Sequence, residues 1–166
     1  SLLKRPGVDV PGFYEARCGA DGHFLALEPT TAEAPAVITR RILEKLPPAL
    51  VRPIVPFLQT IHDRAAVEIQ RGCTQGCRFC QAGMIYRPTR ERSPAEVVQA
   101  ARELMRNTGY DELSLLSLST TDHSQNVPML NPLTSPFDDP KVGIPSTHTD
   151  SFPDHAAHAV AEGTQQ

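Results

Sequence analysis

The positions of the prolines limit where this chain can form regular structure. Eight of the 16 prolines lie between residues 6 and 56, and six more lie between residues 128 and 153. Proline lacks a backbone N–H and interrupts helices and central strands. The stretch from Phe57 to Val127 contains only Pro88 and Pro94. The sequence therefore predicts that the regular core lies in this central stretch.

The first third of the chain predicts a β-hairpin and a linker. Residues 12–18 and 23–28 are strand-like and flank an Asp21-Gly22 turn signal. Residues 37–43 predict either a strand or a short helix, and the prolines that follow predict an extended path. We expect residues 1–60 to be a hairpin and proline-rich linker, the tail of an upstream domain, and residues 61–166 to be an incomplete core domain.

The centre predicts an α/β fold. A strand over 65–70 is followed by a loop and then by Ser93-Pro94-Ala95-Glu96, a helix start in which Ser93 and Glu96 cap each other. That helix is predicted to end near Gly109, and residues 112–119 read as a buried strand. Strand, helix and strand form a βαβ unit. Four prolines between residues 128 and 140 argue against a helix following Asp122, and residues 141–144 predict a third strand.

Composition excludes several classes of protein. The chain is 40% hydrophobic and 21% charged, which is typical of one globular domain, and its net charge of −3 indicates neither a nucleic-acid partner nor a membrane partner. It has no apolar run of 18 residues and no recognisable signal peptide, so we expect a cytoplasmic location. The initial Ser1 and the end of the chain without an obvious element suggest a fragment.

Three of the four cysteines form a compact motif. Cys73, Cys77 and Cys80 have the spacing C-x3-C-x2-C on the loop after the predicted strand, which indicates a metal or redox site. Three thiolates can hold three irons of a cubane cluster and leave the fourth iron without a protein ligand. Zinc with His62 as a fourth ligand is the alternative, although the chain has no second C-x2-C and no paired histidine near it. Cys18 is remote in sequence and reads as a buried or incidental thiol.

The segment from Val67 through Pro88, followed by Arg90-Glu91-Arg92-Ser93-Pro94, resembles the core of radical S-adenosylmethionine (SAM) enzymes. More narrowly, it resembles uncharacterised members that carry a cobalamin-binding-like domain before the core. The resemblance implies the N-terminal part of a partial (β/α)6 barrel, in which Cys73, Cys77 and Cys80 bind a 4Fe-4S cluster. It further implies reductive cleavage of SAM to a 5'-deoxyadenosyl radical, a reductant such as flavodoxin or ferredoxin, and an unknown substrate. Cobalamin would belong to a full-length parent.

The resemblance also suggests residues for binding SAM. Phe79 matches an aromatic residue whose backbone meets the adenine, and core packing is the alternative role of its ring. Ser117, Ser119 and Thr120 end the second predicted strand, where the family often has a Gly-Gly-Glu-like motif; this chain has no Glu there, and turn chemistry is the alternative role. Ser146 lies in a third-strand motif that the family usually continues with Arg, whereas this chain has His148.

Three hypotheses remain open at this point. The first is a radical SAM enzyme or its N-terminal portion, and the second is a non-catalytic iron–sulfur or zinc module. The third is an inactive truncated product. Between residues 71 and 92 five arginines accompany one acid, Glu91, so this loop either balances the charge of anionic cofactors or is a solvated basic surface.

Overall fold

The computed structural model describes residues 2–58, 60–134, 141–148 and 150. The chain divides into two compact units, one ending at Glu44 and the other beginning at Lys45. The predicted domain boundary at residue 60 remains a prediction. No helix among the described residues is long and apolar enough to cross a membrane.

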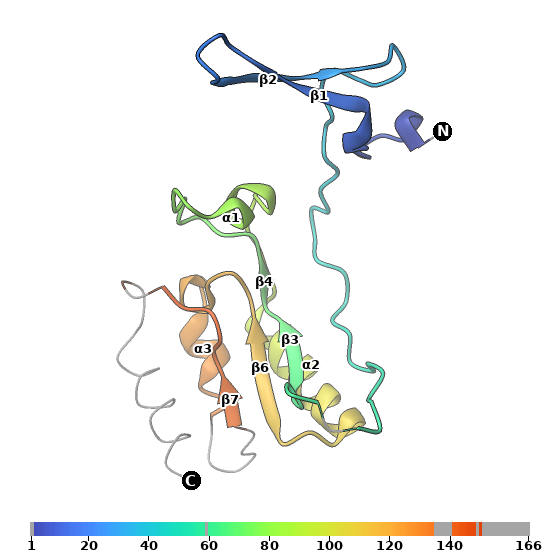
Figure 1. Cartoon of the computed structure of the whole chain (residues 1–166). Helices are drawn as coiled ribbons and strands as arrows, with labels where there is room; N and C mark the ends of the chain where they lie inside the picture. Colours follow the sequence, from blue (N-terminus) through green and yellow to red (C-terminus); the bar gives the residue numbers. More distant parts are fainter. Residues whose placement is uncertain (1, 59, 135–140, 149, 151–166) are drawn as a thin grey trace. The chain divides into compact units, whose positions relative to one another are not determined.

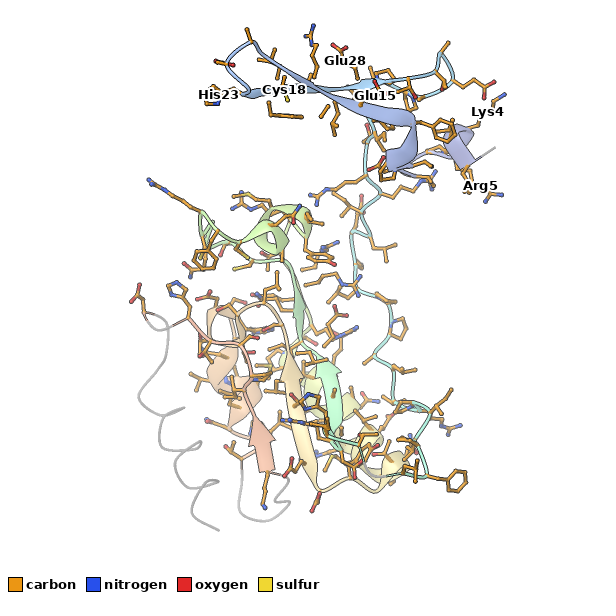
Figure 2. All side chains as sticks on the ribbon, viewed as in Figure 1. Lys4, Arg5, Glu15, Cys18, His23 and Glu28 are labelled. Atoms are coloured by element: carbon orange, nitrogen blue, oxygen red, sulfur yellow. The ribbon has the colours of Figure 1, made fainter. Side chains whose placement is uncertain are left out.

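The first unit is built around a β-hairpin. Short 3-10 helices at Leu2–Lys4 and Pro11–Phe13 precede strand β1 (Tyr14–Cys18), which pairs antiparallel with β2 (Phe24–Pro29). Gly22 adopts a positive φ of 79° in the turn, so the predicted Asp-Gly hairpin is confirmed. Figure 2 labels Glu15, Cys18 and Glu28 on this hairpin. The predicted strand or short helix at residues 37–43 is wrong, because these residues form no regular element.

The second unit contains a three-stranded parallel sheet in the order β3-β6-β7 (Figure 1). Its strands are β3 (Ala65–Glu68), β6 (Glu112–Leu116) and β7 (Lys141–Gly143). Helix α2 (Pro94–Thr108) connects β3 to β6, which run parallel with Val67 opposite Leu115. The predicted βαβ unit and the predicted third strand are confirmed. The chain thus has a mixed α/β fold with a parallel sheet, and the complete (β/α)6 barrel remains a prediction.

Helix α2 begins and ends where local chemistry predicts. Ser93 is the N-cap and forms a reciprocal capping box with Glu96, and Pro94 occupies the first turn. Gly109 ends the helix in the left-handed conformation at φ 76°, its N–H bonding the carbonyl of Met105. The helix buries Val97, Ala100, Ala101 and Leu104 against the sheet.

A short helix, α3 (Asn126–Leu130), follows β6, so the prediction of no helix after Asp122 is wrong. Pro128 is the third residue of this helix. Because the first backbone N–H groups of a helix have no partner within it, a proline there removes no hydrogen bond. Met129 and Leu130 are buried in the same core as α2, and this burial accounts for a helix that periodicity did not reveal.

Three further elements carry the cysteine region. Strand β4 (Gln70–Arg71) continues from β3 and pairs antiparallel with β5 (Arg90–Glu91). Between them lie the cysteine loop and helix α1 (Gln81–Ile85), beyond the end of β3 (Figure 1). The sequence did not predict α1 or the β4–β5 pair.

Candidate metal and cofactor site

The candidate site lies at the carboxyl edge of the parallel sheet. The cysteine loop follows β3 and β4, Ser117 to Thr120 follow β6, and Ser146 follows β7. In open α/β sheets ligands bind outside the carboxyl ends of the strands. Parallel pairing brings these three segments to one edge although they are distant in sequence.

Hydrogen bonds join the three segments. The Thr120 N–H donates to the Ser146 carbonyl at 2.7 Å, which links the ends of β6 and β7. The Gln75 amide, inside the cysteine loop, donates to Asp122 Oδ2 at 2.9 Å. Glu91 accepts bonds from the N–H and the hydroxyl of Ser124, the former at 2.9 Å. The cysteine loop is thereby tied to the segment after β6.

The cysteines of the motif are all free thiols. Cys73 is buried, Cys77 and Cys80 are half-buried, and no disulfide joins them. The Gln75 N–H donates to Cys73 Sγ at 3.5 Å and the Gly83 N–H donates to Cys80 Sγ at 3.3 Å. Hydrogen bonds to sulfur are one of the means by which proteins tune iron–sulfur clusters. The donor set therefore fits a cluster with thiolate ligands.

His62, the fourth zinc ligand of the alternative, lies apart from the cysteine motif in the chain. Among the described residues, no set of three or more His, Cys, Asp or Glu side chains is placed to hold a metal ion. His62 precedes β3, whereas the cysteines follow it, and its ring contacts Arg64 at 3.0 Å. A cubane cluster makes a different demand, because each cysteine binds a different iron. Cys18 lies exposed in β1 of the other unit, so the alternative that it is a buried thiol is wrong.

Two glycines shape the cysteine loop. Gly72 has φ 91°, and a Cβ there would lie 2.6 Å from the Tyr86 carbonyl oxygen and 2.8 Å from that of Pro88. The chain before Cys73 thus runs tightly against the segment that leaves α1. Gly76 has φ 66°, and a Cβ there would lie 3.2 Å from the Arg87 guanidinium. Arg87 accordingly places a positive charge beside the loop that joins Cys73 to Cys77.

A pocket of about 440 Å³ adjoins this loop. Its lining comes from the end of β3, from β4 and the residue after it, from the end of α1 and from the end of β6: Glu68, Gln70, Arg71, Gly72, Tyr86, Leu116, Ser117 and Leu118. A pocket of this size, largely apolar with a few convergent polar groups, is typical of small-molecule sites.

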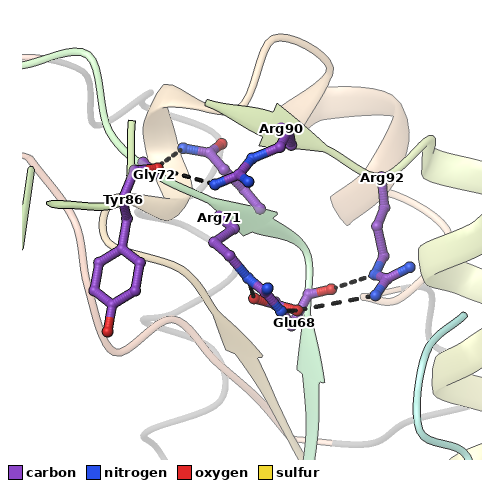
Figure 3. Close-up of polar contacts among 7 residues, drawn as sticks. Glu68, Arg71, Gly72, Tyr86, Arg90 and Arg92 are labelled. Atoms are coloured by element: carbon purple, nitrogen blue, oxygen red, sulfur yellow. Dashed lines mark hydrogen bonds and ion pairs between the residues drawn. The ribbon is translucent and has the colours of Figure 1, made fainter. Parts of the chain in front are cut away.

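Glu68 and Arg71, which line the pocket, belong to a network of polar contacts (Figure 3). Arg71 donates to both oxygens of Glu68, at 2.7 and 2.9 Å, and this hydrogen bond raises the pKa of Arg71 above its ordinary value. Arg92 is buried; its Nε donates to the Glu68 carbonyl at 2.8 Å and its Nη2 lies 3.9 Å from Glu68 Oε2. The Arg90 guanidinium donates to the Tyr86 carbonyl at 3.0 Å. Much of the local positive charge is therefore engaged by protein groups rather than forming a solvated basic surface.

The residues predicted to bind SAM are placed as follows. Ser117 lines the pocket, and its hydroxyl lies 2.8 Å from that of Thr120, which is buried. Ser119 is buried and its Oγ has no hydrogen-bond partner among the described residues. Phe79 is 91% exposed, so the alternative that its ring packs in the core is wrong. Ser146 is half-buried and contributes its carbonyl to the Thr120 contact.

Reasoning from the sequence missed most of the pocket lining, including two polar side chains, those of Glu68 and Gln70. The alternation of side chains along a strand could have identified both residues. Val67 and Ile69 belong to the core, so the side chains of the residues next to them must face the other side of the strand. A charged and an amide side chain on that second face of a buried strand indicate a site rather than packing.

Comparison with known proteins agrees with this architecture. Residues 67–148 match the model of the Radical SAM superfamily. Over these residues the chain belongs to the radical SAM superfamily, whose cofactors are a 4Fe-4S cluster and SAM. Superfamily membership and the relatives below indicate an enzyme. The narrower resemblance to members with a cobalamin-binding-like domain remains a prediction.

Curated relatives include enzymes named tRNA-2-methylthio-N(6)-dimethylallyladenosine synthase. Those from Staphylococcus epidermidis (strain RP62A) and Shouchella clausii (strain KSM-K16) are each 27% identical over 116 residues, and that from Staphylococcus aureus (strain JH9) is 26% identical. In each comparison the match covers 66% of this chain and 22% of the relative. The chain therefore spans about a fifth of the length of these relatives. No solved structure gives a significant match.

Proposed function

We propose that this chain supplies the cofactor-binding part of a radical SAM enzyme. Cys73, Cys77 and Cys80 would hold a 4Fe-4S cluster, and the neighbouring pocket would hold SAM. The single observation that carries the proposal is the C-x3-C-x2-C motif of free thiols, placed by β3 and β4 at the carboxyl edge of a parallel sheet within the superfamily match. When both groups are bound, the chemistry available at the site is the reductive cleavage of SAM to methionine and a 5'-deoxyadenosyl radical.

The residues of this chain have distinct tasks in the proposal. The backbone N–H groups of Gln75 and Gly83 would donate to two of the ligand sulfurs, those of Cys73 and Cys80, and hydrogen bonds to the sulfurs tune the reduction potential of an iron–sulfur cluster. Arg87 adds positive charge beside the loop, which opposes the negative charge of thiolate ligands.

The segment after β6 lies at the same sheet edge as the cysteine loop and contributes Ser117 and Leu118 to the pocket lining. Ser117 lines the pocket, and Ser119, one residue beyond Leu118 of the same lining, has a buried Oγ with no partner in the described part of the chain, which fits a role in holding a polar ligand. The Ser117–Thr120 contact fixes the orientation of the Ser117 hydroxyl. We propose Ser117, Ser119, Thr120, Ser146 and the backbone near Phe79 as SAM contacts.

The reductant would be a small electron-transfer protein such as flavodoxin or ferredoxin. The match covers 22% of the length of relatives that are named for a tRNA nucleoside, so the proposal does not extend to a substrate. Enzymes that share a cofactor site bind their substrates through other parts of the fold, and these parts differ from one enzyme to the next.

Anaerobic reconstitution tests the proposal. The protein is loaded with iron and sulfide, reduced with dithionite, and examined by electron paramagnetic resonance with and without SAM. We expect a 4Fe-4S signal that changes when SAM is added, and release of 5'-deoxyadenosine measured by chromatography.

Two cysteine variants make the test specific. Cys77→Ala removes a proposed ligand, so the signal should be lost, whereas Cys18→Ala removes an exposed thiol of the other unit and should retain it. A protein that binds one zinc and no iron, or a signal that survives Cys77→Ala, would refute the cluster assignment. A cluster signal that SAM does not change would instead support the non-catalytic iron–sulfur alternative.

A further inference from the structure

The side chain of Gln70 is buried with one polar atom unused. Gln70 is 2% exposed in strand β4. Its Nε2 donates to the Gly72 carbonyl at 3.4 Å, whereas its Oε1 has no hydrogen-bond partner among the described residues. Because an amide nitrogen cannot accept and a carbonyl cannot donate, the contact with Gly72 fixes which end of the amide is left over. The unused atom is an acceptor.

Gln70, which carries the unused oxygen, is one of the residues that line the pocket described above. The other polar side chains that are at least partly buried in this lining have protein partners: Glu68 binds Arg71, and the Ser117 hydroxyl contacts Thr120. A buried acceptor without a partner costs free energy, so native proteins keep such atoms rarely. Within the described lining, Gln70 Oε1 is thus the buried atom that a ligand would satisfy.

The position of Gln70 connects this oxygen to the cysteine motif. The Gly72 carbonyl that Gln70 holds is in the residue directly before Cys73. Gly72 is itself held tightly against the segment around Tyr86 and Pro88. One side chain therefore contacts the backbone of the proposed cluster loop through its nitrogen, and the same residue lines the pocket and carries a buried oxygen that has no partner among the described residues.

The polar and apolar groups that line the pocket determine which kind of ligand it can bind. An amide oxygen only accepts, so it selects an N–H or O–H group and disfavours a carboxylate or phosphate oxygen. Leu116, Leu118 and the Tyr86 ring add apolar surface to the lining. The ligand therefore combines hydrogen-bond donors with apolar surface. SAM has this character, since it carries amino and hydroxyl donors on an adenosyl group.

We propose that Gln70 contacts SAM directly and that its Oε1 accepts a hydrogen bond from an N–H or O–H group of SAM. This assignment rests on the proposed function, because it takes the pocket beside the cysteine loop as the SAM site. Gln70 is then a residue that determines affinity for the cofactor.

The test is the dissociation constant of SAM, measured by anaerobic isothermal titration calorimetry on the reconstituted chain. Gln70→Leu keeps a similar volume and removes the acceptor, and it should weaken SAM binding by about tenfold or more, which corresponds to roughly 1.4 kcal/mol. Gln70→Glu keeps an acceptor and should bind SAM more tightly than Gln70→Leu. Gln99→Leu alters an exposed glutamine of α2 and should leave the dissociation constant unchanged.

Three outcomes separate the assignments. If Gln70→Leu binds SAM as tightly as the wild type, the role of Gln70 is wrong while the proposed function stands. If the wild-type chain forms its cluster but binds no SAM, the proposed function itself fails, and the role of Gln70 falls with it. Far-UV circular dichroism and the iron content of each variant show whether that variant has folded and loaded its cluster. Should Gln70→Leu fail to load iron, Gln70→Met provides the same loss of the acceptor, and wild-type SAM affinity in that variant would equally overturn the assignment.

Discussion

Adding one methyl group at Gly72 should destabilise the protein much more than the same change at Gly109. Both glycines have positive φ, 91° and 76°, so alanine is strained at either position by about 1–2 kcal/mol. At Gly109 a Cβ would meet no atom within 4 Å, and strain is the whole cost. At Gly72 it would lie 2.6 Å from the Tyr86 carbonyl oxygen, where ordinary contact begins at 3.4 Å. That oxygen would have to move by about 0.8 Å in a packed segment.

Overpacking of this kind costs roughly 1–3 kcal/mol beyond the strain, so Gly72→Ala should lower the free energy of unfolding by about 2–5 kcal/mol. Gly109→Ala should lower it by about 1–2 kcal/mol. The chain has no tryptophan, so urea unfolding followed by far-UV circular dichroism is the suitable assay. Gly72→Ala should also load less iron, because the clash lies next to Cys73. Equal losses for the two variants would refute the close approach of residues 72 and 86–88.

Other expectations concern the helix, the core and the ion pair. Ser93→Ala removes the cap of α2 and should cost about 1 kcal/mol in urea unfolding, whereas an unchanged stability would contradict the capping box. The backbone hydrogen bond from Ser93 lowers the pKa of Glu96 below its ordinary value of 4.5, so its stabilising contribution is present above that pH and is lost as the pH falls through the lower, folded-state pKa. The stability difference between wild type and Glu96→Gln should therefore shrink below about pH 4, and a difference that grows there would show the opposite sign. Leu104 is 1% exposed, so Leu104→Ala should cost about 2–5 kcal/mol, and a loss below about 1 kcal/mol would contradict its place in the core. Glu68→Gln leaves the buried Arg92 without its nearby carboxylate and should destabilise more than Glu28→Gln, which breaks the exposed pair with Arg17 at 2.9 Å in the other unit.

The sequence predicted well wherever structure depends on neighbours a few residues apart. The capping box at Ser93 and Glu96, the terminator Gly109 and the Asp21-Gly22 turn all involve contacts within about four residues. The C-x3-C-x2-C spacing likewise identified the candidate cluster ligands before any fold was known. The strand and helix patterns around them predicted the βαβ unit.

Predictions were less successful where burial overrides local preference. Helix α3 contains Pro128 and exists because Met129 and Leu130 pack into the core with α2. Helix α1 has five residues, too few for a periodic signal. Residues 37–43 carry strand-like composition but form no regular element, which shows that β-branched residues alone do not make a strand without a partner.

The sequence by itself determined the chemistry available to this protein: three thiols on one loop, a strand before them and a capped helix after them. Only the tertiary structure decided which groups meet. Gln75 contacts Asp122 across 47 residues of sequence, and Glu91 contacts Ser124 across 33. Parallel pairing of β3 with β6 brings Gln70 and Ser117 into the lining of one pocket, where the Gln70 amide oxygen has no partner among the described residues. The physical reason is that strand pairing and burial act between segments distant in the chain, and no local pattern records which polar atom they leave unsatisfied.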